Sequence, residues 1–150
     1  LTRPTKRGYN VSMSKPQLRW TETIPTVQDY LDLRIATGLG AKPPQEVAER
    51  ALANSLYMIC AYQGQRLVCF ARIAGDGALS YIINSVMVAP EFQGQGLGKA
   101  LMQAISDWLI ANADASAYVC LMAKEPADQL YQQFGFQAIP GNIGMRWIKP

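Results

Sequence analysis

The chain has 150 residues, of which 49% are hydrophobic, and its net charge of +3 is spread along the sequence without long blocks of one sign. This composition fits one globular domain with a continuous core and does not indicate a broad polyanion-binding surface. The sequence contains no histidine, which excludes Ser-His and Cys-His nucleophilic sites and most zinc or iron ligand sets.

The N-terminal residues 1–12 are basic, polar and interrupted by proline and glycine. We expect them to form a flexible leader or to remain from cloning, since Met13 could serve as a natural start, and we expect residues 13–150 to form a single domain. No apolar run approaches the roughly 20 residues that a membrane-spanning helix needs. Three cysteines within apolar runs, without CxxC spacing, are typical of reduced thiols and favour the cytoplasm.

The first part of the chain predicts one strand, two helices and then three strands. Residues 17–23 fit a strand, and helices are expected over 27–37, entered through Pro25 and Thr26, and after Pro43 and Pro44. From residue 56 the pattern becomes that of strands with short turns between them. Three runs are therefore predicted to pair as an antiparallel meander, over 56–62, 66–74 and 79–88.

The second part of the chain begins with a helical pattern. Leu97, Leu101, Ile105 and Leu109 recur every four residues, which predicts a long amphipathic helix. A strand is expected over Ala117 to Met122, a short helix after Pro126, and two last strands over 136–139 and 144–148. This order predicts an α/β (α+β) domain with three layers.

The segment EFQGQGLGKA, residues 91–100, places three glycines between the end of a predicted strand at Val88 and the start of the long helix. Such a turn directs several backbone N–H groups toward one point, which favours anion binding. Glycine allows close approach of a phosphate and tolerates positive φ. The alternative is a glycine-rich turn without a ligand.

Two familiar glycine patterns do not fit this turn. The pattern GxxxxGK[ST] would need glycine at Gln93 and serine or threonine at Ala100. The pattern GxGxxG fails because Lys99 or Leu101 occupies the place of its third glycine. Nucleotide hydrolysis and Rossmann-type chemistry are therefore not supported.

The spacing Gln93-x-x-Gly96-x-Gly98 resembles the pyrophosphate loop of the GCN5-related N-acetyltransferase (GNAT) superfamily. Residues 127–136, ADQLYQQFGF, resemble its second signature, in which Ala-x-x-(Phe/Leu)-Tyr precedes Gly-Phe. The expected element order is similar to that of the superfamily from about residue 17 onward. The resemblance implies the GNAT acyl-CoA N-acyltransferase fold: a mixed central sheet with splayed parallel strands, and helices on both faces.

The resemblance also implies acetyl-CoA as co-substrate and no metal. The cofactor would lie where the strands ending at Val88 and Met122 splay apart. Main-chain groups of Val86, Met87 and Val88 would bind the pantetheine as an added strand does. The pyrophosphate would rest on the loop and the start of the helix, where Lys99 either reaches a phosphate or extends into solvent: Gln93, Gly94, Gln95, Gly96, Leu97, Gly98 and Lys99.

The implied reaction is direct attack of an amine on the thioester, with the backbone N–H of Met87 or Val88 stabilising the tetrahedral oxyanion. Tyr131 occupies the superfamily's position for the acid that protonates the leaving thiolate, and its alternative role is a core aromatic. Without histidine the base is left open among a water chain, an amine that arrives neutral, and three carboxylates: Glu22, Glu91 and Glu125. Lys124 replaces an asparagine that many family members use against the cofactor.

The expected acceptor is a primary amine of a small molecule. Asn84 and Ser85 either hold substrate or water or mark a β-bulge, and Tyr30 and Arg34 are further acceptor candidates, together with Tyr81, the loop 37–42 and residues 140–144. Two alternatives stay open: acetylation of a protein lysine, a protein N-terminus or aminoacyl-tRNA, and a noncatalytic acyl-CoA sensor. Neither nucleic acid nor membrane is an expected partner, and the oligomeric state is left open, a homodimer included.

Overall fold

The structure, a computed structural model, describes residues 17–150, so the leader expected at 1–12 lies outside the described residues. Its centre is a five-stranded sheet in the order β1-β2-β3-β4-β5. The strands are β1 Arg19–Thr21, β2 Tyr57–Gln63, β3 Arg66–Gly75, β4 Ser80–Val88 and β5 Tyr118–Cys120. The pairs from β1 to β4 are antiparallel and β4 pairs with β5 in parallel, which confirms the predicted meander.

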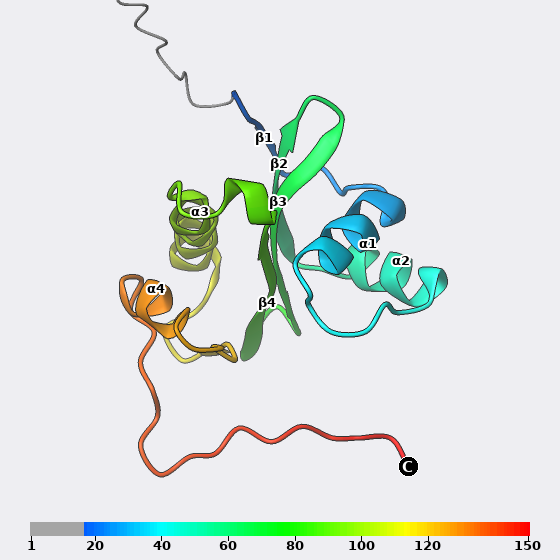
Figure 1. The fold of residues 1–150 in the computed structure, drawn as a ribbon. Helices are drawn as coiled ribbons and strands as arrows, with labels where there is room; N and C mark the ends of the chain where they lie inside the picture. The colour runs from blue at the N-terminus through cyan, green and yellow to red at the C-terminus, as the bar shows by residue number, and fades with distance from the viewer. Residues whose placement is uncertain (1–16) are drawn as a thin grey trace, which may run out of the picture.

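Helices cover both faces of this sheet (Figure 1). On one side lie α1 Val27–Ala36 and α2 Gln45–Ala53, and on the other lie α3 Leu97–Asn112 and the short α4 Asp128–Gln132. A 3-10 turn, η1 Pro90–Phe92, leads from β4 toward α3. The three-layer arrangement that the sequence predicts is therefore confirmed.

Local sequence explains why the helices begin where they do. The Thr26 hydroxyl accepts a hydrogen bond from the Asp29 amide at 3.1 Å and so caps α1. Leu31 and Leu33 of α1 are buried on one face of the sheet, and Leu101 and Ile105 of α3 on the other. Burial of these apolar side chains supplies the main driving force for the layered packing.

The centre of the sheet is mostly apolar and includes two of the three cysteines. Cys60 in β2 and Cys69 in β3 are free, and neither side chain is exposed. Burial raises the pKa of both thiols to about 12, so both stay protonated at neutral pH. These two cysteines are therefore core residues.

The pairing of β4 with β5 is short. Only Ser80, Tyr81 and Ile82 face β5 residues, and β4 then continues to Val88. Residues 83–88 thus have one edge without a partner strand, which is the splay expected of this fold. The strand predicted to run to Met122 ends at Cys120 instead, because no backbone of β4 lies alongside residues 121 and 122.

The two terminal strands predicted over 136–139 and 144–148 are wrong, because neither segment is in a strand. Between them the Asn142 amide donates to the Ile139 carbonyl at 3.2 Å, and Gly141 has φ +75°. Proline second and a positive-φ glycine third are the features of a type II turn. Such a turn does not match the twist of paired strands, so it does not bring the two segments together as a hairpin.

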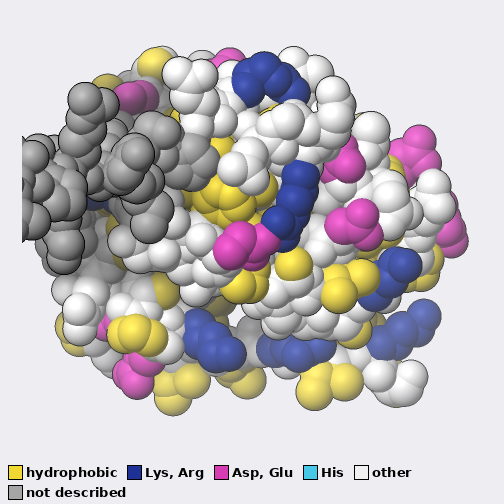
Figure 2. Space-filling model, turned by 45° about the horizontal axis from the view of Figure 1, so that its top comes forward, with side chains coloured by type: hydrophobic (Ala, Val, Ile, Leu, Met, Phe, Trp, Pro, Cys, Tyr) yellow, Lys and Arg dark blue, Asp and Glu magenta, His cyan; other side chains and the backbone are white. Residues whose placement is uncertain are grey.

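The described residues include no helix that is both long enough and apolar enough to span a bilayer. Figure 2 shows side chains of both charge signs on one face of the molecule. Lysine and arginine are more frequent toward its lower part, where hydrophobic side chains also lie exposed.

Candidate active site

The glycine-rich loop forms the turn from β4 into α3. Phe92 is buried and anchors the loop in the core, while the Gln93 side-chain amide donates to the Val88 carbonyl at 3.1 Å and ties the loop to the end of β4. Gly94 has φ +74°, and Gly96, the N-terminal cap of α3, has φ +81°. Both conformations are strained for residues with a Cβ, so the backbone path itself requires glycine.

This backbone path leaves a run of amides free. In residues 17–150, no protein acceptor takes a hydrogen bond from the backbone amides of residues 94–99, and the first amide bonded after the loop is that of Ala100, to Gly96. A hollow of roughly 180 Å³ lies over them. Its lining residues come from the end of β4, the loop and the first turn of α3: Val88, Phe92, Gln93, Gly94, Gly96, Leu97 and Gly98.

Unpartnered amides and the positive end of the α3 dipole together make this hollow suited to a phosphate or diphosphate group. Lys99 is exposed in the first turn of α3, on a side chain long enough to reach a bound phosphate. Six of the seven residues predicted to hold the pyrophosphate, those at 94–99, have a backbone amide without a protein acceptor. The seventh, Gln93, lines the hollow and also fixes the loop.

The third glycine of the loop has a packing role. A Cβ at Gly98 would lie 3.2 Å from Leu130 Cδ2 of α4, which is tighter than ordinary van der Waals contact. The absence of a side chain at Gly98 therefore lets α4 approach the start of α3. This contact brings Tyr131, the next residue of α4, to the same side of the sheet as the loop.

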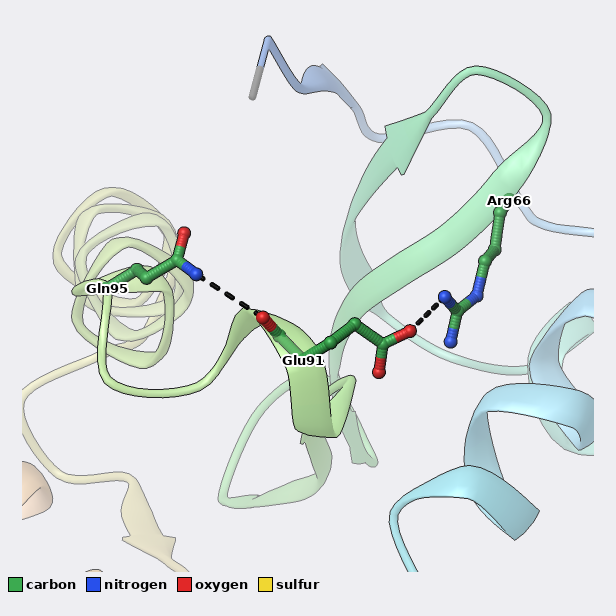
Figure 3. Close-up of polar contacts among 3 residues, drawn as sticks. All are labelled: Arg66, Glu91 and Gln95. Carbon is green, nitrogen blue, oxygen red and sulfur yellow. Dashed lines mark hydrogen bonds and ion pairs between the residues drawn. The ribbon is translucent and has the colours of Figure 1, made fainter. Parts of the chain in front are cut away.

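A polar cluster supports the outer side of the loop (Figure 3). Arg66 at the start of β3 forms a salt bridge with Glu91 of η1, and both side chains are about half exposed. The Gln95 side-chain amide donates to the Glu91 carbonyl at 3.3 Å. The hydrogen bond from Arg66 holds the pKa of Glu91 below its usual value, so this carboxylate is committed to an ion pair and is a poor general base.

Tyr131 is half buried, and burial raises the pKa of its phenol. Its ring meets the ring of Phe136 edge-on, with the centroids 6.4 Å apart. A raised pKa keeps the hydroxyl protonated through the neutral range, which is the state that a proton donor needs. The same ring also packs against the core, which supports the core-aromatic role, while its role as an acid stays a prediction.

The polar pair within β4 lies at a bulge. The register between β3 and β4 shifts between Phe70 and Arg72, and opposite this shift Ser85 has φ +52°. The Asn84 side-chain oxygen accepts a hydrogen bond from the Ser85 amide at 2.9 Å. The predicted β-bulge is thus confirmed, and it places two polar side chains beside the splayed edge.

Three of the four residues predicted to bind the acceptor are joined by hydrogen bonds. The hydroxyls of Tyr30 and Ser85 lie 3.0 Å apart, and Arg34 donates to the Tyr30 hydroxyl at 3.3 Å. Arg34 also reaches the Ala41 carbonyl at 3.4 Å, which links this network to the loop 37–42. Asn84 is joined through the backbone of Ser85, whereas residues 140–144 lie beyond the sheet.

Sequence reasoning missed Arg72, which is paired with Asn84 across the two strands. One of its terminal nitrogens donates to the Ser55 hydroxyl at 3.3 Å, but its Nε is buried without a partner in the described residues. A buried donor without a hydrogen-bond partner is costly, so this nitrogen is an unusual feature of the core. The signal was present as a single charged residue within an otherwise apolar run.

Glu22, another carboxylate considered as base, accepts a hydrogen bond from the Tyr57 hydroxyl at 2.9 Å. This bond and burial both raise the pKa of Tyr57, burial being the larger cause. Residues 17–150 contain no cluster of cysteine, aspartate and glutamate side chains that could hold a metal ion. Glu22 and Glu91 are thus both held by hydrogen bonds to other side chains, and the identity of the base stays open.

Together, a splayed parallel pair and a loop of free amides at a helix N-terminus match the arrangement expected from the sequence for an acyltransferase that uses an acyl-CoA thioester. The family model for the acetyltransferase (GNAT) domain matches residues 27–149. The chain therefore belongs to the GNAT acetyltransferases, and the fold and the enzyme class expected from the sequence are confirmed.

A solved structure of a probable acetyltransferase from Staphylococcus aureus is 35% identical and covers 89% of this chain and all of its own, with a TM-score of 0.82. A histone acetyltransferase of Glycine max is 37% identical over 84 residues, which are 55% of this chain and 36% of that protein. A chloroplastic serotonin N-acetyltransferase of Oryza sativa is 35% identical over 85 residues, or 56% of this chain and 42% of that protein. The chain spans about a third of the length of the first curated relatives that it matches.

Proposed function

We propose that this protein transfers an acetyl group from acetyl-CoA to a primary amine of a small molecule, by direct attack through a tetrahedral intermediate. The observation that carries the proposal is the row of free backbone amides at residues 94–99, over a hollow at the end of the splay. A diphosphate bound there would lie at the end of β4 whose residues 83–88 have an unpartnered edge.

The free edge of β4 suits the pantetheine arm of the carrier. Its amides would bond to main-chain groups of Val86, Met87 and Val88, as a peptide strand bonds to a sheet edge. A thioester held along that edge would present its carbonyl oxygen to the N–H of Met87 or Val88. That donor would stabilise the oxyanion formed when the amine attacks.

Collapse of the tetrahedral intermediate breaks the carbon–sulfur bond, and the thiolate that leaves then takes up a proton. We assign this proton to the Tyr131 hydroxyl, whose raised pKa keeps it protonated at neutral pH. The contact between Leu130 and Gly98 holds this part of α4 against the cofactor loop. Tyr131 is thus the one catalytic side chain of the proposal.

The acceptor side of the site is built from the network of Tyr30, Ser85 and Arg34. The hydroxyls of Tyr30 and Ser85 and the side-chain amide of Asn84 can form hydrogen bonds with an uncharged amine. They can also hold a water molecule that takes the proton of the amine. Since Glu91 is held in an ion pair, we assign deprotonation to such a water or to bulk solvent before binding. The Arg34 guanidinium would meet an electron-rich or anionic part of the acceptor.

Two observations bear on the size of the acceptor. One relative is named for serotonin, an amine with an aromatic ring, and the network here includes the aromatic Tyr30. Another relative is named for histones, so acetylation of a protein amine is the second candidate.

We place the reaction in the cytoplasm, on the basis of the reduced cysteines.

The experiment is a thiol-release assay with acetyl-CoA and a panel of amines. The panel contains arylalkylamines, polyamines, a lysine-containing histone-tail peptide and a peptide with a free N-terminus. Release that saturates with a small amine and exceeds release with either peptide supports the proposal. Faster release with a peptide would favour the second candidate, and no release by a protein that binds acetyl-CoA would favour a noncatalytic sensor.

A further inference from the structure

Two partly buried arginines lie beside the polar residues of the proposed acceptor side. Arg34 belongs to the last turn of α1, and Arg72 belongs to β3. Neither side chain is fully exposed, so both guanidiniums have lost part of their hydration. A charge that is withdrawn from water is costly unless an oppositely charged or hydrogen-bonding partner compensates for the loss.

Both arginines are on the face of the sheet that α1 and α2 cover (Figure 1). Arg72 donates to the hydroxyl of Ser55, just beyond the end of α2, at 3.3 Å. Arg34 donates to the Tyr30 hydroxyl, which itself lies 3.0 Å from the hydroxyl of Ser85 in β4. The two guanidiniums thus reach the same layer of the molecule from different elements.

Asn84 links the two arginines through the bulge of β4. It is paired with Arg72 across the strands, and residues paired in this way lie on the same face of a sheet. Its side-chain oxygen accepts a hydrogen bond from the Ser85 amide, and the bulge turns the Ser85 hydroxyl toward α1. We call this group of side chains the arginine cluster: Tyr30, Arg34, Arg72, Asn84 and Ser85.

No carboxylate of the chain neutralises either arginine of the cluster. Within residues 17–150 neither guanidinium lies within 4.0 Å of a carboxylate oxygen, whereas Arg66 does form a salt bridge, with Glu91. The sequence of residues 1–16 contains no aspartate or glutamate that could supply a counter-charge. The cluster therefore has two positive charges and no negative one.

Most N–H groups of the two guanidiniums also lack a protein acceptor. In the described part of the chain Arg34 donates only to the Tyr30 hydroxyl and the Ala41 carbonyl. Arg72 donates there only to the Ser55 hydroxyl, and its buried Nε has no partner. A guanidinium offers more donors than either arginine uses. Such donors are suited to the oxygens of an anion, each of which accepts more than one N–H group.

The diphosphate of the cofactor does not account for these donors. It would lie on the free amides of residues 94–99, beyond the end of β4 at Val88. The cluster begins at Asn84 and Ser85, so roughly 10 Å of strand separates it from the loop. A second anionic group, distinct from the diphosphate, therefore fits the cluster.

We propose that the acceptor is a primary amine that carries a carboxylate or phosphate at its other end, and that Arg34 and Arg72 bind this anionic group. Because the amine is the acceptor of the proposed function, the anion site depends on that function. The strand gives the scale of the acceptor. Asn84 lies three positions before Met87, a proposed oxyanion donor, which is about 10 Å in a regular strand and less across a bulge. An amine and an acid joined by a short alkyl chain span this distance.

The bonds of the two arginines also fit a purely structural role. Arg72 ties β3 to the end of α2 through Ser55, and Arg34 ties α1 to the loop 37–42 through Ala41. Loss of such ties would lower stability and would affect every acceptor alike. Loss of an anion site would affect only acceptors that carry the anion. Matched acceptors with and without the anionic group therefore separate the two roles.

The first test measures thiol release from acetyl-CoA by the unaltered protein with three matched pairs of amines. The members of a pair share one chain with and without the acid: γ-aminobutyrate and propylamine, ε-aminocaproate and pentylamine, and phosphoethanolamine and ethanolamine. We expect kcat/KM to be about tenfold or more higher for the anionic member of at least one pair, because charge-assisted hydrogen bonds are the stronger ones. The pair with the largest preference identifies the anion.

The outcomes of this test distinguish the anion site from the proposed function. Release with equal kcat/KM in both members of every pair would overturn the anion site and leave the proposed function intact. Release with no small amine, in these pairs or in the wider panel, would overturn the proposed function and the anion site together.

The second test removes each positive charge in turn. Arg34→Gln and Arg72→Gln should each raise the KM for the preferred anionic amine by about tenfold or more, and leave the KM for its neutral partner and for acetyl-CoA within about twofold. Arg72→Lys keeps the charge and should recover part of the loss. The matched control is Arg50→Gln, which removes one positive charge from an exposed position of α2 and should change none of these constants. An equal rise for both members of a pair would mean that the arginines only hold the fold together.

A measurement on the unaltered protein decides the question if a variant does not fold, which circular dichroism and the melting temperature show. The acid that lacks the amine, such as butyrate for γ-aminobutyrate, should inhibit competitively against the preferred amine and not against acetyl-CoA. Competition with acetyl-CoA alone would place the anion on the cofactor loop and overturn the anion site. The absence of any inhibition would contradict it as well.

Discussion

The hydroxyl oxygens of Tyr30 and Ser85 lie 3.0 Å apart in the interior, although the two residues are 55 positions apart in the chain. Tyr30 comes from α1 on one face of the sheet, and Ser85 is the bulged residue of β4. Their contact joins the helix layer to the strand that carries the proposed thioester. A bulge is what turns the Ser85 side chain toward that helix, because it re-aims side chains relative to the regular alternation.

Replacing Tyr30 with phenylalanine should destabilise the fold by about 1 kcal/mol, because the buried Ser85 hydroxyl loses its partner while the ring keeps its packing against Phe70. Urea unfolding followed by fluorescence measures this difference. The control is Tyr118→Phe, in which the exposed hydroxyl is removed at no comparable cost. Equal stability of the Tyr30 variant and the unaltered protein would mean that the hydroxyl pair contributes nothing.

The same variant also tests the acceptor role. If the network positions the amine, Tyr30→Phe should raise the KM for the amine severalfold while leaving the KM for acetyl-CoA within about twofold. Initial rates measured against each substrate separate the two. A rise in the KM for acetyl-CoA alone would place the network on the cofactor side instead.

Gly96→Val should reduce acetyl-CoA binding by more than tenfold. No atom lies within 4 Å of a Cβ built at Gly96, so the side chain would fit sterically, but it would project beside the free amides. Because φ is +81°, the substitution also costs about 1–2 kcal/mol in backbone strain. Isothermal titration calorimetry measures the loss of binding directly.

A matched control separates strain from blocked binding. At Gly38, which follows the end of α1, φ is +66° and the space around an added Cβ is equally open. This position lies away from the glycine-rich loop between β4 and α3. We expect a similar drop in melting temperature for both variants and unchanged acetyl-CoA affinity for Gly38→Val alone. Tight binding by Gly96→Val would mean that the diphosphate rests elsewhere.

Elements whose signals lie within a few residues could be predicted from the sequence. The four-residue recurrence of Leu97, Leu101 and Ile105 predicts α3, and alternation broken by short turns predicts β2, β3 and β4. The glycine loop could be predicted because the backbone of this turn requires glycine at fixed positions, and the spacing of the glycines in the sequence shows those positions. Each of these follows from local chain geometry.

Features that depend on distant partners could not be predicted in the same way. Nothing next to Ser85 in the sequence indicates that Tyr30 will lie against it, and the unpartnered Nε of Arg72 depends on three elements packed together. The terminal strands failed for a related reason. A strand pattern such as that of Gly144 to Ile148 states a preference, but forming a strand requires an adjacent edge.

Glu91→Gln should lower stability near neutral pH and have little effect in acid. The bond from Arg66 lowers the pKa of Glu91, so the ion pair stabilises the fold above the carboxyl's unfolded value of 4.5, and this contribution is lost as pH falls through the lower folded pKa. Both side chains are half exposed, so the effect should be small and should shrink at high salt. Melting temperatures of the two proteins should therefore differ at pH 7 and converge as the pH falls below the lowered pKa of Glu91.

Tyr131→Phe should lower kcat by about a hundredfold or more, which is the range for loss of a positioned proton donor. The KM for acetyl-CoA should stay within about twofold, because the ring and its contact with Phe136 are kept. Tyr118→Phe, on an exposed strand position, serves as the control and should retain full kcat. Unchanged turnover in Tyr131→Phe would leave this tyrosine as a packing residue only.

The pH profile gives a second test of the same residue. Burial raises the pKa of Tyr131 above the ordinary tyrosine value of 10, so the protonated acid persists to higher pH than a free tyrosine would. Activity in the unaltered protein should therefore rise as the amine loses its proton and fall only above pH 10. Because phenylalanine has no proton to lose, the residual activity of the variant should lack that alkaline decline.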